Sequence, residues 1–126
     1  MLIENTLNPA DEKVYEFVDK VFTEVAALFP GAYIHMGGDE CYHGYWDENH
    51  EVQEFMKKNN IDNSDKLQSY FVKRVEKIIS SKGKKMIGWN EILLGGGLAE
   101  NAAVMSWQGM KEGIKASQMG HNVVMT

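Results

Sequence analysis

The chain has 126 residues, of which 44% are hydrophobic and 25% charged, a composition typical of a globular chain of one domain or less and not of a disordered one. Its net charge of -5 and its scattered lysines and arginines argue against binding to a phosphate backbone, which excludes nucleic acid as an expected partner. No apolar run reaches the roughly 20 residues of a membrane span, so no membrane partner is expected, and residues 1–13 lack the basic start and apolar core of a signal peptide.

The first predicted element is a helix that begins at Pro9 and ends at Leu28. Asn8 is its expected N-cap, and acidic residues occupy its first turn. One face of this helix repeats apolar residues at helical spacing: Val14, Phe17, Val18, Val21, Val25 and Leu28. The helix leads into an apolar run at residues 32–36, which predicts a strand buried on both faces.

Strands and helices alternate along the rest of the chain. Further strands are expected near residues 85–89, 102–107 and 121–126, and helices over residues 49–60, 64–81, 98–101 and 110–120. The helix over 64–81 would begin with Asn63 or Ser64 as its cap and end before Gly83, with one buried face formed by Leu67, Phe71, Val75 and Ile78. This alternation predicts a parallel α/β sheet, either as a small open domain or as part of a (β/α)8 barrel, which takes about 250 residues.

Two glycines and two adjacent carboxylates follow the first predicted strand. Gly37 and Gly38 end the strand, and Asp39 and Glu40 come next, where residues of a parallel sheet face the ligand crevice. Two neighbouring carboxyl groups in a poorly solvated site cannot both ionise easily, so one stays protonated as a general acid. This division suits the cleavage of a glycosidic bond. The alternative is a surface turn with two solvated acids.

Two tryptophans favour the catalytic interpretation. Trp89 and Trp107 each lie at the predicted carboxyl end of a strand, which is the sheet edge expected for Asp39 and Glu40. Tryptophan is more often a core residue, but several aromatic rings at such an edge suit a sugar-binding pocket.

The segments FPGAYIHMGGDE, KLQSYFVKRVEKIISSKGKKMIGWNEIL and AVMSWQG together resemble the family 20 glycoside hydrolases, the β-N-acetylhexosaminidases. The signature His-x-Gly-Gly-Asp-Glu of that family is met by His35, Gly37, Gly38, Asp39 and Glu40. A second family segment is met by Gly88, Trp89, Asn90 and Glu91. The resemblance covers nearly the whole chain and implies a (β/α)8 barrel, of which residues 1–126 would span the helix after the third strand through about the seventh strand.

The resemblance also implies a mechanism in which the 2-acetamido group of the substrate attacks the anomeric carbon. Glu40 would be the general acid and then the general base, and Asp39 would orient the acetamido group. Trp89 and Trp107 would bind the substrate, a terminal β-linked N-acetylglucosaminide or N-acetylgalactosaminide. His35, Gly37, Gly38 and Glu91 would support the site. No cofactor is implied.

The resemblance also has gaps. The arginine near the first strand, the upstream Asp and His, and the downstream Tyr-x-Asp and Trp-x-Glu groups of the family have no counterpart in this chain. We therefore expect no useful hexosaminidase activity from this polypeptide alone, and self-association through open barrel edges. Cellular location stays open, because the single Cys41 does not indicate a redox compartment and members of the family are often secreted, periplasmic or lysosomal.

Two other interpretations of the sequence concern catalysis and metal binding. Gly-Gly-Asp-Glu also begins the signature of diguanylate cyclases, but Cys41 replaces the phenylalanine of that signature. A metal site could be formed by His35, Cys41, His43 and His50, although their order lacks the paired spacing of zinc ligands. We instead expect residues 41–46 to form a loop over the cleft.

Overall fold

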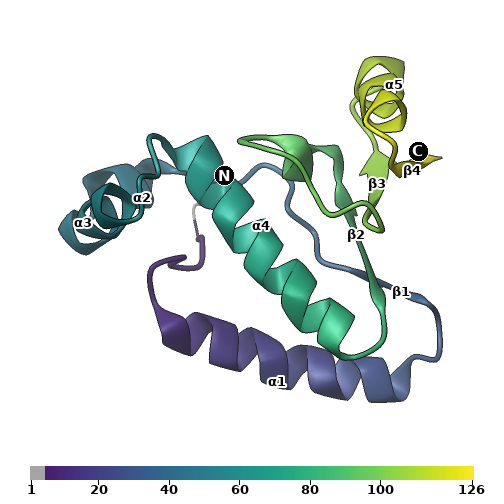
Figure 1. Ribbon diagram of the computed structural model, residues 1–126, viewed down its shortest axis with the longest axis horizontal. Coiled ribbons are helices and arrows are strands. Elements are labelled where there is room, and N and C mark those ends of the chain that lie inside the picture. Colours follow the sequence, from purple (N-terminus) through teal and green to yellow (C-terminus); the bar gives the residue numbers. More distant parts are fainter. Residues whose placement is uncertain (1–4) are drawn as a thin grey trace.

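The computed structural model describes residues 5–126 and contains a sheet of four parallel strands in the order β1-β2-β3-β4 (Figure 1). The strands are β1 (Tyr33–His35), β2 (Lys85–Trp89), β3 (Ala103–Ser106) and β4 (Asn122–Met125). Each strand pairs with the next one along the chain, and helical segments make the connections. The predicted parallel α/β sheet is therefore confirmed. Residues 1–4, which belong to the segment judged not to be a signal peptide, lie outside the described residues.

Helices cover one face of this sheet. The helical elements are α1 (Glu12–Leu28), α2 (Gly44–Glu48), α3 (His50–Lys58), α4 (Ser64–Ser81), the short 3-10 helix η1 (Asn90–Leu93) and α5 (Met110–Gln118). Helices α1 and α4 lie side by side against β1 and β2, and α5 lies beside β3 and β4 (Figure 1). The main core between α1, α4 and the sheet contains Val18, Ile34, Val72, Val75, Ile79, Met86 and Ile92.

The opposite face of the sheet is open at its two edge strands, whereas Ile87 and Ala103 at its centre are buried. Parallel register places Tyr33, His35, Trp89 and Val124 on this face, away from the helices. Tyr33 is 40% exposed, and Ile34 is the one buried residue of β1. The prediction that β1 is buried on both faces is therefore wrong, because no element within residues 5–126 covers its second face.

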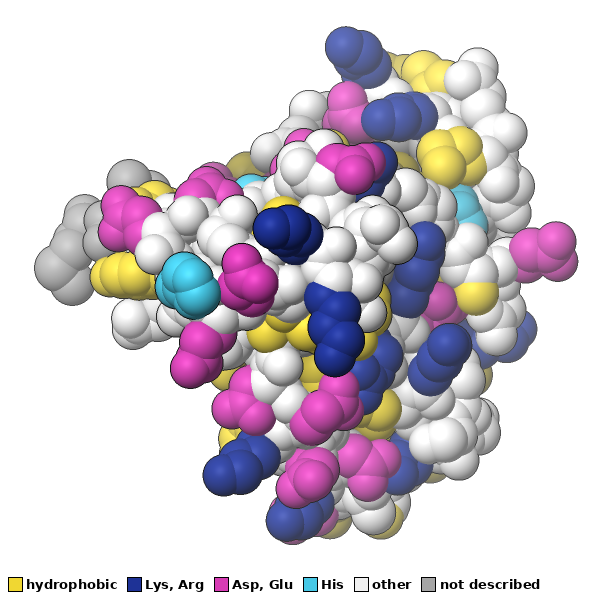
Figure 2. Space-filling model, turned by 60° about the vertical axis from the view of Figure 1, so that its left-hand side comes forward, with side chains coloured by type: hydrophobic (Ala, Val, Ile, Leu, Met, Phe, Trp, Pro, Cys, Tyr) yellow, Lys and Arg dark blue, Asp and Glu magenta, His cyan; other side chains and the backbone are white. Residues whose placement is uncertain are grey.

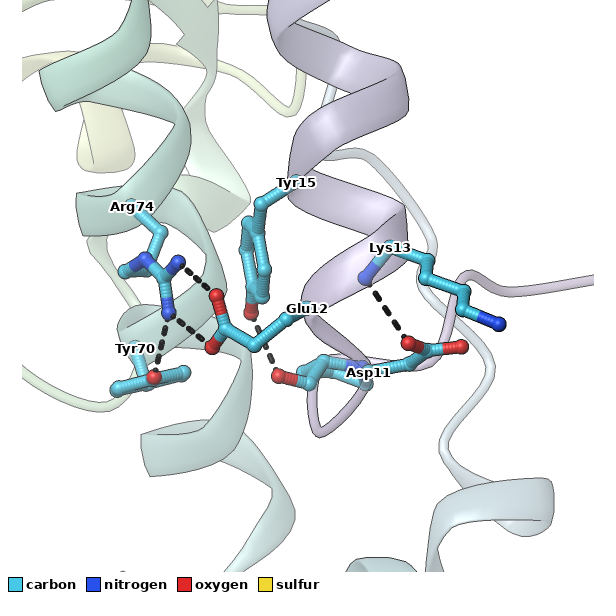
Figure 3. Close-up of polar contacts among 7 residues, drawn as sticks. Asp11, Glu12, Lys13, Tyr15, Tyr70 and Arg74 are labelled. Carbon is cyan, nitrogen blue, oxygen red and sulfur yellow. Dashed lines mark hydrogen bonds and ion pairs between the residues drawn. The ribbon is translucent and has the colours of Figure 1, made fainter.

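Helix α1 begins three residues later than predicted. The Asn8 side chain accepts the backbone N–H of Ala10 at 2.9 Å and closes a turn before the helix. Asp11 is the N-cap, since its carboxylate accepts the N–H of Lys13 at 2.9 Å (Figure 3). The prediction of Asn8 as N-cap is wrong because this side chain forms a local turn instead.

The buried face of α1 also differs from the prediction. Tyr15 and Val18 are buried, whereas Phe17 is 59% and Leu28 is 74% exposed. The side of α1 that packs on α4 and the sheet is rotated from the predicted one and includes Val14, Phe22, Val25 and Ala26. Apolar residues on both sides of the helix made the sequence pattern ambiguous, and contact with α4 decides between them.

Most later elements agree with the sequence. Asn63 caps α4 by accepting the N–H of Lys66 at 2.9 Å, and Gly83 follows the helix with a positive φ of 72°. The weak helix over 49–60 is present as α3. The short helix expected near residues 98–101 is wrong: this segment is a turn, and the helical turn is η1, which directly follows β2.

Charge on the surface is mixed. Figure 2 shows lysine and arginine side chains interspersed with aspartate and glutamate over one face of the molecule. Across residues 5–126, no helix has the length and apolar character needed to cross a membrane.

Candidate active site

The two glycines after β1 allow the chain to turn closely against the end of β2. Gly37 and Gly38 have φ values of 79° and 97°, which favour glycine. The Gly37 carbonyl accepts the N–H of Trp89 at 3.0 Å. A Cβ atom on Gly38 would lie 2.5 Å from Ile92 Cγ2, so a side chain has no room there. The glycines therefore join the ends of two neighbouring strands and fix the start of the Asp39–Glu40 segment.

Asp39 and Glu40 lie at the carboxyl end of β1 and line one cavity. The volume of this cavity is about 530 Å³. Its other lining residues are Asn5, Thr6, Leu7, Met36, Gly38, Cys41, Tyr42, Trp46, Gln68, Phe71 and Val72. Both carboxylates are exposed, so the poor solvation expected for this pair is not present in the described part of the chain. The reason is that no described element covers the open side of the sheet.

The backbone of Glu40 is unusual. Its φ is 42°, in the left-handed region that non-glycine residues rarely adopt. Such conformations cost on the order of 1 kcal/mol and cluster at functional sites. This feature could not be predicted from the sequence, which has glycine at positions 37 and 38 but not at 40.

His35 makes the kind of structural contact expected of it. Its Nδ1 accepts the N–H of Gly37 at 3.0 Å, and its ring packs against Trp89 with the ring centroids 4.9 Å apart. Partial burial lowers the pKa of His35, and the negative charge of Asp39 acts in the opposite direction. The neutral imidazole is therefore favoured, with Nδ1 free to accept the hydrogen bond.

A second group of predicted residues joins the ends of β2 and β3. The Trp107 indole donates to both carboxylate oxygens of Glu91 at 3.2 Å. Asn90, which is buried, accepts the backbone N–H of Trp107 at 3.3 Å and donates to Gln108 at 2.7 Å. Trp89 and Trp107 lie at the same sheet edge as Asp39 and Glu40 but do not line their cavity.

Sequence reasoning missed a contact between α4 and the carboxylate segment. Gln68 is buried, donates to the Gly38 carbonyl at 3.2 Å and accepts from His43 Nε2 at 2.8 Å. The His43 ring stacks on Trp46 with the centroids 4.9 Å apart. The sequence offers one indication of this contact: Gln68 is a polar residue directly after Leu67, on a helix face that is otherwise apolar. Gln68 thereby fixes the backbone directly before Asp39.

Cys41 lies beside Glu40 in the cavity and is a free thiol. Burial raises its pKa to about 11, so the thiolate is disfavoured. Among residues 5–126, no three histidine, cysteine, aspartate or glutamate side chains come together in a group that could hold a metal ion, and this includes His35, Cys41, His43 and His50.

The family model "Glycosyl hydrolase family 20, catalytic domain" matches residues 2–126. A "Beta-hexosaminidase" of Porphyromonas gingivalis is 48% identical over 115 residues, which cover 91% of this chain and 15% of that protein. The "Beta-hexosaminidase subunit alpha" of Bos taurus is 38% identical over 87 residues, covering 68% of this chain and 16% of that subunit. This chain thus spans less than a fifth of the length of these two relatives.

Solved structures are also similar. The chitobiase of Flavobacterium johnsoniae superimposes with a TM-score of 0.90 and 38% identity, covering all of this chain and 20% of that one. The exo-β-N-acetylglucosaminidase of Vibrio harveyi in complex with N-acetylglucosamine gives a TM-score of 0.88 and 34% identity, covering 96% of this chain and 19% of that one. These similarities confirm the predicted fold class, four parallel strands that form part of a (β/α)8 barrel.

Proposed function

This chain belongs to glycosyl hydrolase family 20, and we propose that Glu40 and Asp39 are the catalytic carboxylates of a β-N-acetylhexosaminidase. The observation that carries the proposal is their position: both follow β1 at the carboxyl edge of a parallel sheet and line the same cavity. The left-handed backbone of Glu40 adds support, because such strain is common at catalytic residues. Membership of this family favours a hydrolase over the diguanylate cyclase alternative.

The proposed reaction uses the substrate's own acetamido group. The acetamido oxygen attacks the anomeric carbon while the bond to the leaving oxygen breaks, and Glu40 gives its proton to that oxygen. A cyclic oxazolinium ion results. Glu40, now ionised, takes a proton from water as the water oxygen attacks the anomeric carbon and the ring opens. Configuration at the anomeric carbon is retained, and no cofactor takes part.

Asp39 would stabilise the positive charge of the oxazolinium ion and orient the acetamido group. Its place beside Glu40 in the cavity supports this role. Trp89 would wall the acetamido pocket and Trp107 would contact the sugar, both from the same sheet edge. His35, Gly37, Gly38 and Glu91 would hold these groups in place through the contacts described above. The substrate would be a terminal β-linked N-acetylglucosaminide or N-acetylgalactosaminide, as the names of the relatives suggest.

We further propose that residues 1–126 span the helix after the third strand through the seventh strand of the barrel, and that turnover needs the other strands. The exposure of Asp39 and Glu40 supports this, because a glycosidase excludes water from its general acid. Self-association is also proposed. Within the described residues β1 and β4 each pair with one neighbour only, and Phe17 and Leu28 of α1 are exposed. Sedimentation of residues 1–126 tests this proposal, and a monomer at micromolar concentration would contradict it.

The test of function is release of p-nitrophenol from the β-N-acetylglucosaminide and the β-N-acetylgalactosaminide. The full-length polypeptide that carries residues 1–126 is compared with its Glu40→Gln variant and with residues 1–126 alone. We expect Glu40→Gln to lower kcat by roughly 100-fold or more. p-Nitrophenolate needs little help from an acid to leave, but Glu40 is also the proposed general base of the second step, and a general base contributes about that much. Turnover that is unchanged in Glu40→Gln would contradict the assignment, and turnover by residues 1–126 alone would contradict the need for the other strands.

A further inference from the structure

The segment after Glu40 is a loop only as far as His43, so the expectation of a loop over residues 41–46 is wrong for its second half, where α2 begins at Gly44. The aromatic residues of this segment lie on two sides. His43 and Trp46 face inward: they stack on each other, His43 bonds to Gln68, and the Trp46 indole donates to the Leu7 carbonyl at 3.0 Å. Tyr42 and Tyr45, which directly precede His43 and Trp46 in the chain, are 42% and 52% exposed. The inward contacts of His43 and Trp46 therefore hold this segment in place, while the rings of Tyr42 and Tyr45 are exposed to solvent.

The two exposed rings form an ordered pair. The Tyr42 and Tyr45 centroids are 5.6 Å apart with an interplanar angle of 81°, an edge-to-face contact. The Tyr42 side chain also lies against Gly44, where an added Cβ would come 2.6 Å or less from the Tyr42 hydroxyl oxygen and two atoms of its ring. Gly44 has no positive φ, so the requirement for glycine there is the space that Tyr42 occupies. Gly44 thus leaves the space that the Tyr42 side chain occupies, and the edge-to-face contact with Tyr45 orients the ring.

Tyr42 lines the same cavity as Glu40, two residues away along the chain. In the proposed reaction Glu40 gives its proton to the leaving oxygen, so whatever that oxygen carries must lie next to Glu40. A pyranose ring has a flat C–H face that packs on an aromatic ring, and its hydroxyl groups can bond to a phenol. Resting on the proposed function, we propose that Tyr42, oriented by its contact with Tyr45, binds the leaving sugar and makes the site prefer a saccharide leaving group.

The test compares two substrates of the full-length polypeptide that differ in the leaving group. N,N′-Diacetylchitobiose releases a sugar, whereas β-N-acetylglucosaminyl fluoride releases an ion with no ring to bind. We expect Tyr42→Ala to lower the ratio of kcat/KM for chitobiose over the fluoride by roughly 5-fold to 10-fold, the scale of one aromatic contact. Tyr42→Phe, which keeps the ring, should retain most of the ratio, and Gly44→Ala should lower it by displacing the ring.

Phe17→Ala is the control, since Phe17 is an exposed aromatic residue on helix α1, away from the open sheet face, and does not line the cavity. Its ratio should equal that of the parent. If Tyr42→Ala leaves this ratio unchanged, Tyr42 does not bind the leaving sugar, and the proposed function still stands. If the parent turns over neither substrate, the proposed function fails and this subsite fails with it.

Discussion

Trp107 donates its indole N–H to both carboxylate oxygens of Glu91, at 3.2 Å each, across the ends of β3 and β2. Trp107 is 42% exposed, so packing alone does not fix its ring. The Glu91 carboxylate holds the side chain of Trp107. The side-chain amide oxygen of Asn90 accepts the backbone N–H of Trp107 and holds its main chain. The neighbouring pair in the Gly-Trp-Asn-Glu segment thus positions the next aromatic residue of the proposed sugar site.

Glu91→Ala should release the Trp107 ring, because the charged acceptor is lost while the backbone contact to Asn90 remains. A hydrogen bond to a charged group contributes about 1.5 kcal/mol, and partial exposure reduces this, so kcat/KM of the full-length polypeptide should fall roughly 5-fold. Glu91→Gln keeps an acceptor and should lose less. Acrylamide quenching of tryptophan fluorescence provides an independent readout and should increase in Glu91→Ala. Equal quenching in the parent and both variants would contradict this role for Glu91.

The sequence was sufficient for the elements whose signals are local. Strand β2 is bounded by charged residues and by Gly83, and Asn63 caps α4, so both could be predicted closely. Asp39 and Glu40 could be predicted as a pair at a sheet edge because they come soon after a strand that two glycines end. The position of these two residues after the strand in the sequence is enough to locate them at the carboxyl edge of the sheet.

The features that sequence reasoning missed depend on contacts between distant residues. Gln68 reaches the Gly38 carbonyl across 30 positions, and no local pattern indicates that pairing. The buried face of α1 was mispredicted because Phe17 and Val18 are adjacent apolar residues, and only packing against α4 selects Val18. Glu40 adopts a left-handed φ without a glycine or asparagine to indicate it.

Gly38→Ala should destabilise the chain by roughly 2 kcal/mol or more. The φ of 97° is strained for alanine, and its Cβ would lie 2.5 Å from Ile92 Cγ2, so backbone strain and overpacking add. Gly31→Ala is the matched control, since Gly31 has open space and no positive φ. Urea denaturation of both variants measures the difference. Similar midpoints for Gly38→Ala and Gly31→Ala would contradict the close approach of this turn to η1.

Arg74 connects α4 to the start of α1 through Tyr15 and Glu12, and it also contacts Tyr70 of its own helix (Figure 3). Its guanidinium carbon lies 3.9 Å from the centre of the Tyr15 ring, and its nitrogens donate to both Glu12 oxygens and to the Tyr70 hydroxyl. Arg74→Lys should lower the free energy of unfolding by about 1 kcal/mol, because an ammonium group cannot stack and bond in both directions at once. Urea denaturation at pH 7 measures this. No change would show that the stacked geometry contributes nothing.

The Glu12 contact gives a dependence on pH. The hydrogen bond from Arg74 lowers the pKa of Glu12 below its ordinary value. A depressed acid pKa contributes stability that is present above the unfolded pKa of about 4.3 and is lost as pH falls through the folded pKa. The stability difference between the parent and Glu12→Gln should therefore be present at pH 7 and shrink below about pH 4. A difference that persists at pH 3 would indicate another cause.

His35 should make the chain less stable as the solution becomes mildly acidic. Partial burial beside Trp89 lowers its folded pKa, and protonation would also remove the Nδ1 acceptor of the Gly37 N–H. Below the unfolded pKa of about 6.5 the unfolded chain binds a proton more readily than the folded one, so stability is full above that pH and falls below it. Urea denaturation at pH 7.5 and 5.5 should show a larger loss for the parent than for His35→Asn.

The charge of Asp39 reduces this loss of stability at mildly acidic pH. Its negative charge favours protonated His35 in the folded chain and so raises the His35 pKa part of the way back. Asp39→Asn should therefore lower the folded pKa of His35 further and steepen the loss of stability between pH 7.5 and 5.5. Adding His35→Asn to that variant should remove the steepening, since the titrating group is gone. If Asp39→Asn changes the slope equally with and without His35, the two residues are not coupled, and the Asp39 charge acts elsewhere.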